Sequence, residues 1–205
     1  ATTRSGGWRW RRKDSLLHVS AAGRVRRVAA LPAALLPANS IAASPDGSAA
    51  FVADYDNNAI RRVEVATGAV TTLAGSGIKG SADGVGEAAQ FCGPSGIAIS
   101  PGGGALFVAE FSNHKIRRVE VATGAVTTLA GSGTDGSADG VGGTAQFYYP
   151  SGGVISPDGS ALFVTDFGNH KIRRVEVATG EVTTLAGSGE DGDADGVGDA
   201  AEFNN

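Results

Sequence analysis

Short apolar runs of five or six residues, separated by polar turns, set the pattern of residues 40–74. After the first run come Pro45, Asp46 and Gly47, which preset or tolerate the dihedral angles of a tight turn. The runs contain many residues that suit a pleated surface, and they lie at residues 40–44, 49–54, 60–65 and 69–74. The pattern predicts four short strands joined by turns, without helical periodicity.

This pattern occurs three times at a step of 56 residues. The segment IRRVEVATGAVTTLAGSG at residues 60–77 recurs unchanged at 116–133, and at 172–189 it differs only by Glu181 in place of alanine. The surrounding residues keep the same step, which makes these acids equivalent: Asp54, Glu110 and Asp166. A period of this length is typical of a repeat protein built from one supersecondary unit.

A single sheet of four short strands cannot bury both of its faces. Such units therefore stack around an axis as the blades of a β-propeller. The predicted fold class is all-β, a β-propeller of four-stranded antiparallel blades. A helical solenoid is excluded because each unit has glycines at its turns and no stretch of helical periodicity. A right-handed β-helix is disfavoured because it needs shorter and more uniform coils.

The repeat step also predicts how the chain is divided. Four parts are expected: a degenerate or partial N-terminal blade at residues 1–39, and three blades with their connections at residues 40–95, 96–151 and 152–205. Within the first part, strands are predicted at residues 8–12, 16–19 and 24–28. β-Propellers close with about four to eight blades. Three arrangements follow from this number: the chain closes as a four-bladed ring, it is an arc of a larger propeller, or several chains assemble. The arc is favoured, because the C-terminal connection ends where a neighbouring blade is expected.

Composition narrows the range of partners. The 32 glycines recur in register with the repeat, so they mark turns rather than a flexible linker. A net charge of −4 gives no overall attraction to nucleic acid, and no nucleic-acid partner is predicted. No apolar run is long enough for a membrane span. The single cysteine, Cys92, cannot form an internal disulfide.

The residues of each unit resemble the NHL repeat. Residues 94–119 and 150–175 follow the pattern PSG-I-A-I-SP-x-G-x-x-L-F-V-A-D/E-x-x-N-H-K-I-R-R-V, with VTTLAGSG and DG-x-G-x-x-A-x-F after it. The resemblance covers residues 40–203 and implies a β-propeller, usually of about six blades. It selects no function, because the family and its relatives include protein-binding and RNA-binding modules, adhesion proteins, and calcium- or zinc-dependent lyases and lactonases.

Recurring polar residues could carry chemistry at a propeller mouth. Each acid is followed three residues later by an asparagine, at Asn57, Asn113 and Asn169, and histidines recur at His114 and His170. A carboxylate beside an amide could hold a metal ion. Presence in every blade favours a structural role instead, since catalysis needs one asymmetric site. We expect the acid to accept backbone N–H groups of its turn and the asparagine to bond its own backbone.

Adjacent arginines occur in each repeat, as Arg117 and Arg118 do in the second. Neighbouring strand residues point to opposite faces, so such a pair cannot form one continuous basic surface for RNA. Glu120 lies two residues after Arg118, on the same side, and can neutralise it. Ion pairing between blades is the favoured role for these residues.

The connection after the third blade resembles a calcium loop. Its acids occupy positions 1, 3, 5, 9 and 12 of the pattern D-x-D-x-D-G-x-x-D-x-x-E, at Asp191, Asp193, Asp195, Asp199 and Glu202. Alternating carboxylates can curl around Ca²⁺, and Gly196 permits the bend. The earlier connections lack the pattern, with Lys79 at the first position. The alternative is that the Asp-Gly pairs are turn residues, with Phe91, Phe147 and Phe203 packed between blades.

Two functions are therefore expected to compete. The first is a non-enzymatic scaffold whose turns and connections bind protein partners or the remainder of the same propeller. The second is a calcium-dependent hydrolase, lactonase or lyase with its acids at the channel mouth. No nucleophile paired with a base is visible in the sequence, which favours the scaffold.

Overall fold

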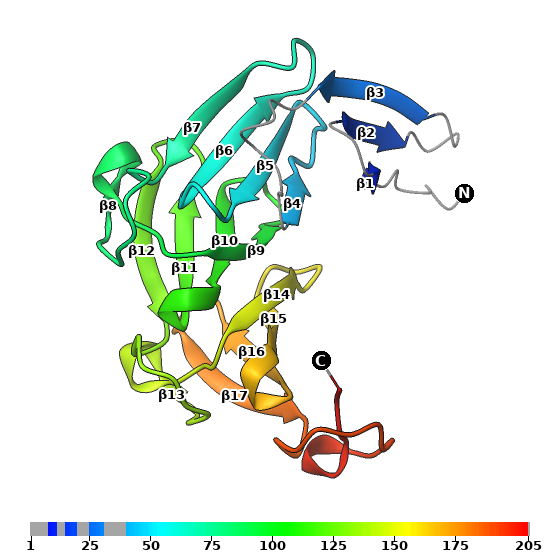
Figure 1. Cartoon of the computed structure of the whole chain (residues 1–205), viewed down its shortest axis with the longest axis vertical. Helices are drawn as coiled ribbons and strands as arrows, with labels where there is room; N and C mark the ends of the chain where they lie inside the picture. The colour runs from blue at the N-terminus through cyan, green and yellow to red at the C-terminus, as the bar shows by residue number, and fades with distance from the viewer. Residues whose placement is uncertain (1–7, 12–14, 20–24, 31–39, 205) are drawn as a thin grey trace.

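The computed structural model describes residues 8–11, 15–19, 25–30 and 40–204, the first three ranges as backbone strands only. These residues form antiparallel sheets joined by turns and 3-10 helices (Figure 1), and none of them is α-helical. The all-β propeller prediction is confirmed. Over the same residues, no helix is long and apolar enough to cross a membrane.

The first complete blade has the four predicted strands. They pair in the order β4-β5-β6-β7, with bounds Ser40–Ala43, Ala49–Asp54, Ala59–Glu64 and Val70–Ala74. The turn between β4 and β5 is held by Asp46, which accepts hydrogen bonds from the hydroxyls of Ser44 and Ser48. Every residue of β5 is buried, which places this strand in the centre of the packing.

The second and third blades repeat this order. Their strands are β9 (Pro94–Ile99), β10 (Ala105–Glu110), β11 (Lys115–Glu120) and β12 (Ala125–Ala130), and then β14 (Pro150–Ile155), β15 (Ala161–Asp166), β16 (Lys171–Glu176) and β17 (Glu181–Ala186). Each of these sheets gains a fifth strand beyond the four predicted. The additions are β8 (Gly84–Val85), which pairs with β12, and β13 (Gly140–Val141), which pairs with β17. The first and second connections thus each contribute a strand to the blade that follows.

The N-terminal region contains a three-stranded sheet. Its strands are β1 (Trp8–Arg11), β2 (Ser15–Val19) and β3 (Val25–Ala30), close to the ranges expected for a degenerate blade. The pairing of Leu17 with Arg27 corresponds to that of Arg61 with Thr72 in the first complete blade. This degenerate sheet therefore has leucine where the complete blades have arginine.

Apolar packing joins neighbouring blades. One core cluster combines Phe51 and Ile60 of the first blade with Phe91 of the connection and Leu106 of the second blade. A second cluster repeats it one blade later, around Phe147. Each fully buried phenylalanine side chain contributes about 1.5–3 kcal/mol. The three complete blades follow one another along an open arc (Figure 1).

A β-bulge occurs at the same place in each complete blade. The register of the third and fourth strands shifts between Ile116 and Arg117 in the second blade, and at the equivalent residues of the other two. A bulge re-aims the side chain next to it. Here it lies beside the first arginine of each pair, the residue around which the polar contacts between blades are built.

Candidate functional site

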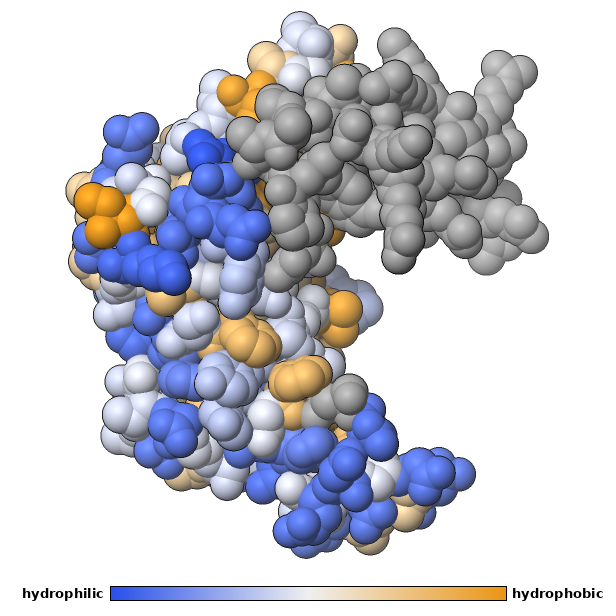
Figure 2. All heavy atoms as spheres, in the orientation of Figure 1, coloured by the Kyte–Doolittle hydropathy of each residue, from blue (hydrophilic) through white to orange (hydrophobic). Residues whose placement is uncertain are grey.

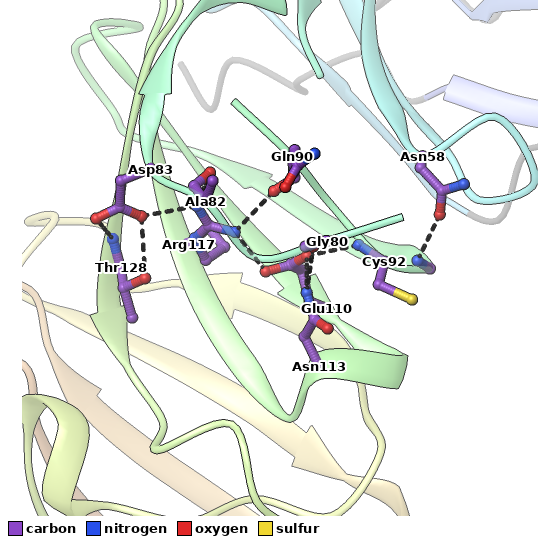
Figure 3. A network of polar contacts seen from close by, with 11 residues as sticks. Asn58, Gly80, Ala82, Asp83, Gln90, Cys92, Glu110, Asn113, Arg117 and Thr128 are labelled. Carbon is purple, nitrogen blue, oxygen red and sulfur yellow. Dashed lines mark hydrogen bonds and ion pairs between the residues drawn. The ribbon is translucent and has the colours of Figure 1, made fainter. Parts of the chain in front are cut away.

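Arg117 is the centre of a buried polar network between the first and second blades (Figure 3). Its Nη1 lies 2.7 Å from Oε2 of Glu110, and both side chains are completely buried. Glu110 ends β10, and its Oε1 accepts the backbone N–H of Cys92 and the side-chain amide of Asn113, each at 2.8 Å. The carboxylate thus binds the connection and its own blade at once.

The preceding connection supplies the other half of this network. Asp83 Oδ1 lies 2.7 Å from Arg117 Nη2, and the carbonyls of Ala82 and Gln90 accept from the same guanidinium at 3.1 Å. Asp83 also accepts the N–H and hydroxyl of Thr128 at 3.2 and 3.1 Å (Figure 3). The Phe91 ring packs 5.3 Å from the guanidinium carbon. A single arginine therefore fastens the connection to the next blade.

The third blade repeats these contacts. Arg173 binds Asp166 at 2.7 Å and Asp139 at 2.8 Å, and Asp139 accepts from Thr184. We name these groups the interblade latches, composed of Arg117, Glu110, Asp83 and Thr128 at the first interface and Arg173, Asp166, Asp139 and Thr184 at the second. Recurrence of the same contacts 56 residues apart identifies them as parts of the repeat.

Burial and hydrogen bonding together set the pKa values of Glu110, Asp166 and Asp139. Burial raises the pKa of Glu110 above its ordinary value, against the opposing effect of Arg117, and burial likewise raises the pKa of Asp166. At Asp139, burial is outweighed by hydrogen bonds from Thr184 and Arg173, which lower its pKa. The oxygens of Glu110 and Asp166 are bonded to arginine, asparagine and backbone N–H groups.

The structural interpretation of the acids therefore fits their contacts, but two of the expected partners are wrong. Glu110 accepts an N–H from the connection and not from its own turn. Asn113 donates to Glu110 and to the carbonyl of Gly80, not to its own backbone. The contacts were predicted within the turn because local sequence patterns report on residues close in the chain. The connection lies more than 15 residues away along the chain and folds back beside Glu110 only in the tertiary structure.

The histidines take a left-handed backbone conformation. His114 and His170 have φ of 54° and 51°, and Asn58 occupies the equivalent place at 49°. The backbone N–H of Tyr149 donates to His114 Nδ1 at 3.2 Å, and that of Gly93 donates to Asn58 Oδ1 at 3.1 Å. Asparagine and histidine are among the residues enriched in this conformation, and here Asn58 and His114 bond the connection that follows. The structural role expected of these histidines matches these contacts.

The second arginine of each pair lies on the opposite face. Arg118 binds Glu120 at 2.5 Å and its side chain is 40% exposed, whereas Arg117 is fully buried. Arg62 pairs with Glu64 and Arg174 with Glu176 in the same way. The predicted neutralisation of these arginines is confirmed, and the pairs form no continuous basic surface.

The five acids of the third connection do not converge. Asp191, Asp193, Asp195 and Asp199 are exposed and Glu202 is half-buried. In the part of the chain that the structure describes, no group of three or more histidine, cysteine, aspartate or glutamate side chains is arranged to hold a metal ion. Hydrophilic residues gather on this C-terminal connection, at the bottom of Figure 2. By the repeat step, Asp195 is equivalent to the latch residues Asp83 and Asp139.

Aromatic side chains from all three complete blades meet at one end of the strands. Phe111 stacks on Tyr149 with ring centroids 4.5 Å apart, and Tyr149 stacks on Tyr148 at 4.4 Å. Tyr55 and Phe167 contact Phe111 at 6.3 and 6.2 Å. We name this group the aromatic strip; it consists of Tyr55, Phe111, Tyr148, Tyr149 and Phe167.

The aromatic strip is accessible and uncharged. Phe167 is 42% exposed and the other four rings are half-buried. The adjacent Tyr149 raises the pKa of Tyr148 above its ordinary value, which itself lies well above physiological pH. The strip was not predicted from the sequence, although an aromatic residue directly follows the recurring acid in each complete blade. Tyr148 and Tyr149 join it only through packing between blades.

Comparisons with known proteins agree with this architecture. A family model described as the NHL repeat matches residues 91–118. The human protein named NHL repeat-containing protein 2 is 34% identical over 154 residues, which is 71% of this chain and 21% of that protein. The chain thus spans about a fifth of the length of this relative.

Solved structures show the same fold. An auxiliary nutrient binding protein from Bacteroides thetaiotaomicron aligns over 94% of this chain and 46% of its own, with 20% identity and a TM-score of 0.72. Virginiamycin B lyase from Staphylococcus aureus aligns over 84% of this chain and 48% of its own, with 18% identity and a TM-score of 0.54. At these identities the likeness concerns the fold alone.

Proposed function

Because the chain belongs to the NHL-repeat family of β-propellers, we propose that it is a non-enzymatic scaffold that binds a protein partner through the aromatic strip. The observation that carries this proposal is the clustering of five aromatic rings at one end of the strands, where three of them stack and two make edge or tilted contacts. Tyrosine and phenylalanine are enriched in protein interfaces, where they supply large contact areas at low entropic cost.

The latch contacts support a non-enzymatic role. Glu110, Asp166 and the first arginines of their blades are buried and bonded to one another, so they face no substrate. The aromatic strip, in contrast, is open at the surface, and three of its rings are already stacked before a partner binds. Preorganised rings lose little freedom on binding, which favours affinity. The expected partner is a protein segment with apolar or aromatic side chains that pack on these rings.

Selection from a random peptide library displayed on phage tests this function. We expect the immobilised chain to enrich peptides that bind the Phe167→Ala and Tyr148→Ala variants at least about tenfold more weakly, as is typical of aromatic anchors. Ile78→Ala and Val85→Ala are matched controls, since these residues are 65% and 60% exposed and lie outside the strip. Peptides that bind all variants equally would contradict the proposal.

A further inference from the structure

The turn between the first two strands of a blade differs in the second blade. The first and third blades have an aspartate in this turn, Asp46 and Asp158, where the second blade has Gly102. Oδ1 of Asp46 accepts the Ser44 hydroxyl at 2.6 Å and the Ser48 N–H at 3.0 Å. The third turn contains the same two hydrogen bonds. Two donors of the turn thus converge on a carboxylate.

The turn of the second blade keeps these donors without the carboxylate. The Gly103 N–H donates to the Ser100 carbonyl at 2.8 Å, and the Ser100 hydroxyl oxygen accepts the Ala105 N–H at 3.0 Å. Both bonds recur in the other two turns, so the three turns share one conformation. Among the residues that the structure describes, the Ser100 hydroxyl and the Gly104 N–H donate to no acceptor. Gly104 is exposed and Ser100 is half-buried, so a ligand can reach both donors.

Space for a carboxylate is present beside these donors. An added Cβ at Gly102 would meet no atom within 4 Å, and this glycine is not at positive φ. An added Cβ at Gly103 would lie 3.0 Å from Cδ of Pro45 in the preceding blade. The equivalent distance from Gly159 to Pro101 is 3.2 Å, so the second and third turns sit alike on their neighbours. Aspartate occupies the position at the second interface, and glycine leaves it open at the first.

The open turn faces a cavity between the first and second blades. The cavity has a volume of about 320 Å³, and Gly102 and Gly103 line it. The first blade contributes Arg62 and Asp46 to the lining. Among the described residues, Arg62 binds Glu64 through Nη2 at 2.7 Å, and its Nε has no hydrogen-bond partner. A cationic side chain with a donor left unpaired therefore shares this cavity with the open turn.

The charges of this cavity favour a ligand that carries both signs. Hydrogen bonds from Ser44, and then from Ser48, lower the pKa of Asp46 from 3.8 to about 2, so this carboxylate is ionised at neutral pH. Glu64 partly neutralises Arg62. A simple anion would be repelled by Asp46, and a simple cation would leave the turn donors unused. A molecule with a carboxylate and an amine complements both.

We propose that this cavity binds a small molecule that carries a carboxylate and an amine. The carboxylate accepts from the Ser100 hydroxyl and the Gly104 N–H, in the position of the aspartate of the other turns, and lies beside Arg62. The ammonium group binds Asp46. The cavity lies beside the start of β5 and the aromatic strip lies beside its end, so this site is separate from the strip and from its proposed partner.

Heteronuclear NMR of the whole chain tests the site, with 4-aminobutyrate and 6-aminohexanoate as probes. We expect at least one probe to shift the Gly104 amide resonance saturably, with a dissociation constant on the order of 1 mM. Hexanoate and hexylamine, which each lack one of the two charged groups, are expected to bind at least about tenfold more weakly than 6-aminohexanoate, because each loses a charged hydrogen bond. No shift of the Gly104 amide with either probe overturns the proposal, as does hexanoate that binds as tightly as 6-aminohexanoate.

Restoring the aspartate blocks the proposed site. Gly102→Asp places a carboxylate of the chain itself on the two donors, so it is expected to shift the Gly104 amide without a probe and to weaken probe binding about tenfold or more. Gly102→Ala is the matched control, because it adds a Cβ in open space without a carboxylate, and it is expected to retain binding. A probe that binds the Gly102→Asp and Gly102→Ala chains equally overturns the proposal, since it then binds elsewhere. The NMR spectrum of each variant also reports whether it is folded.

Discussion

At the scale of single residues, adjacent arginines have different roles. Arg173 is buried between Asp166 and Asp139, while Arg174 lies on the other face and binds Glu176 near the surface. Removal of one partner of a buried ion pair strongly destabilises the folded protein, because the other charge stays buried without compensation. An exposed pair contributes little.

Substitution of these two arginines should therefore separate the roles. We expect Arg173→Leu to lower the free energy of unfolding by about 3–5 kcal/mol, because Asp166 stays buried without its cation. Arg174→Leu should change it by less than about 1 kcal/mol. Urea unfolding followed by circular dichroism measures both. Equal effects of the two variants would show that the Arg173 latch does not stabilise the chain.

The turn acids make stability depend on pH. Hydrogen bonds from Ser156, and then from Ser160, lower the pKa of Asp158 from 3.8 to about 2. Since the folded-state pKa lies below the unfolded value, this aspartate stabilises the fold above pH of about 4, and the contribution is lost as the pH falls toward 2. We expect Asp158→Asn to lower the urea midpoint at pH 6 and to have no effect near pH 2. A constant difference at all pH values would refute this assignment, and Asp199→Asn serves as the exposed control.

At the scale of elements, the connection between two complete blades stabilises the architecture in three ways. It contributes a strand to the next blade, a phenylalanine to the core and an aspartate to the latch. Its glycines permit close backbone contacts. At Gly131, φ is 104° and an added Cβ would lie 2.4 Å from the carbonyl oxygen of His114.

Replacement of this glycine is expected to disturb the connection. Gly131→Ala should lower the free energy of unfolding by more than about 1 kcal/mol, because alanine is strained at positive φ and clashes with the His114 carbonyl. Gly102→Ala is the control, since a Cβ at that turn position meets no atom within 4 Å. Thermal unfolding of the two variants compares them. A Gly131→Ala chain as stable as the wild type would contradict the close packing.

The calcium-loop hypothesis also concerns an element, the connection at residues 190–204. If the loop binds Ca²⁺ in the folded state, millimolar calcium raises the Tm relative to chelator, and Asp193→Ala abolishes the rise. Asp135→Ala in the second connection should leave such a rise unchanged. No calcium-dependent change in the wild type would exclude a stabilising calcium site in this connection.

At the scale of the whole molecule, apolar cores lie between blades rather than within them. Leu129 packs on the core shared with the third blade, but the equivalent Leu185 is 48% exposed. In a repeat architecture, each interface adds to the stability of the blades that it joins. Among the described residues, the outward face of the third blade therefore has one interface fewer than that of the second.

Hydrogen exchange should reveal this difference. We expect the amides of β17 to exchange faster than those of β12, because opening β17 exposes less buried surface. Equal protection of β12 and β17 would contradict the contribution of the interfaces.

The sequence by itself determined the strands, the turns and the fold class. Residues 49–54 and their repeats read as strands because local preferences and the 56-residue step agree, and turn residues such as Asp46 act on neighbours close in the chain. The contrast between the two arginines also followed from strand alternation alone.

Only the tertiary structure decided the contacts that join blades. The partners of Glu110 lie in a connection that folds back beside it, and five aromatic rings meet because three blades pack side by side. The fifth strands depend on the following blade for their hydrogen bonds. The physical reason is common to all three: each contact joins segments brought together by burial of the interblade cores, and a local pattern does not encode that approach.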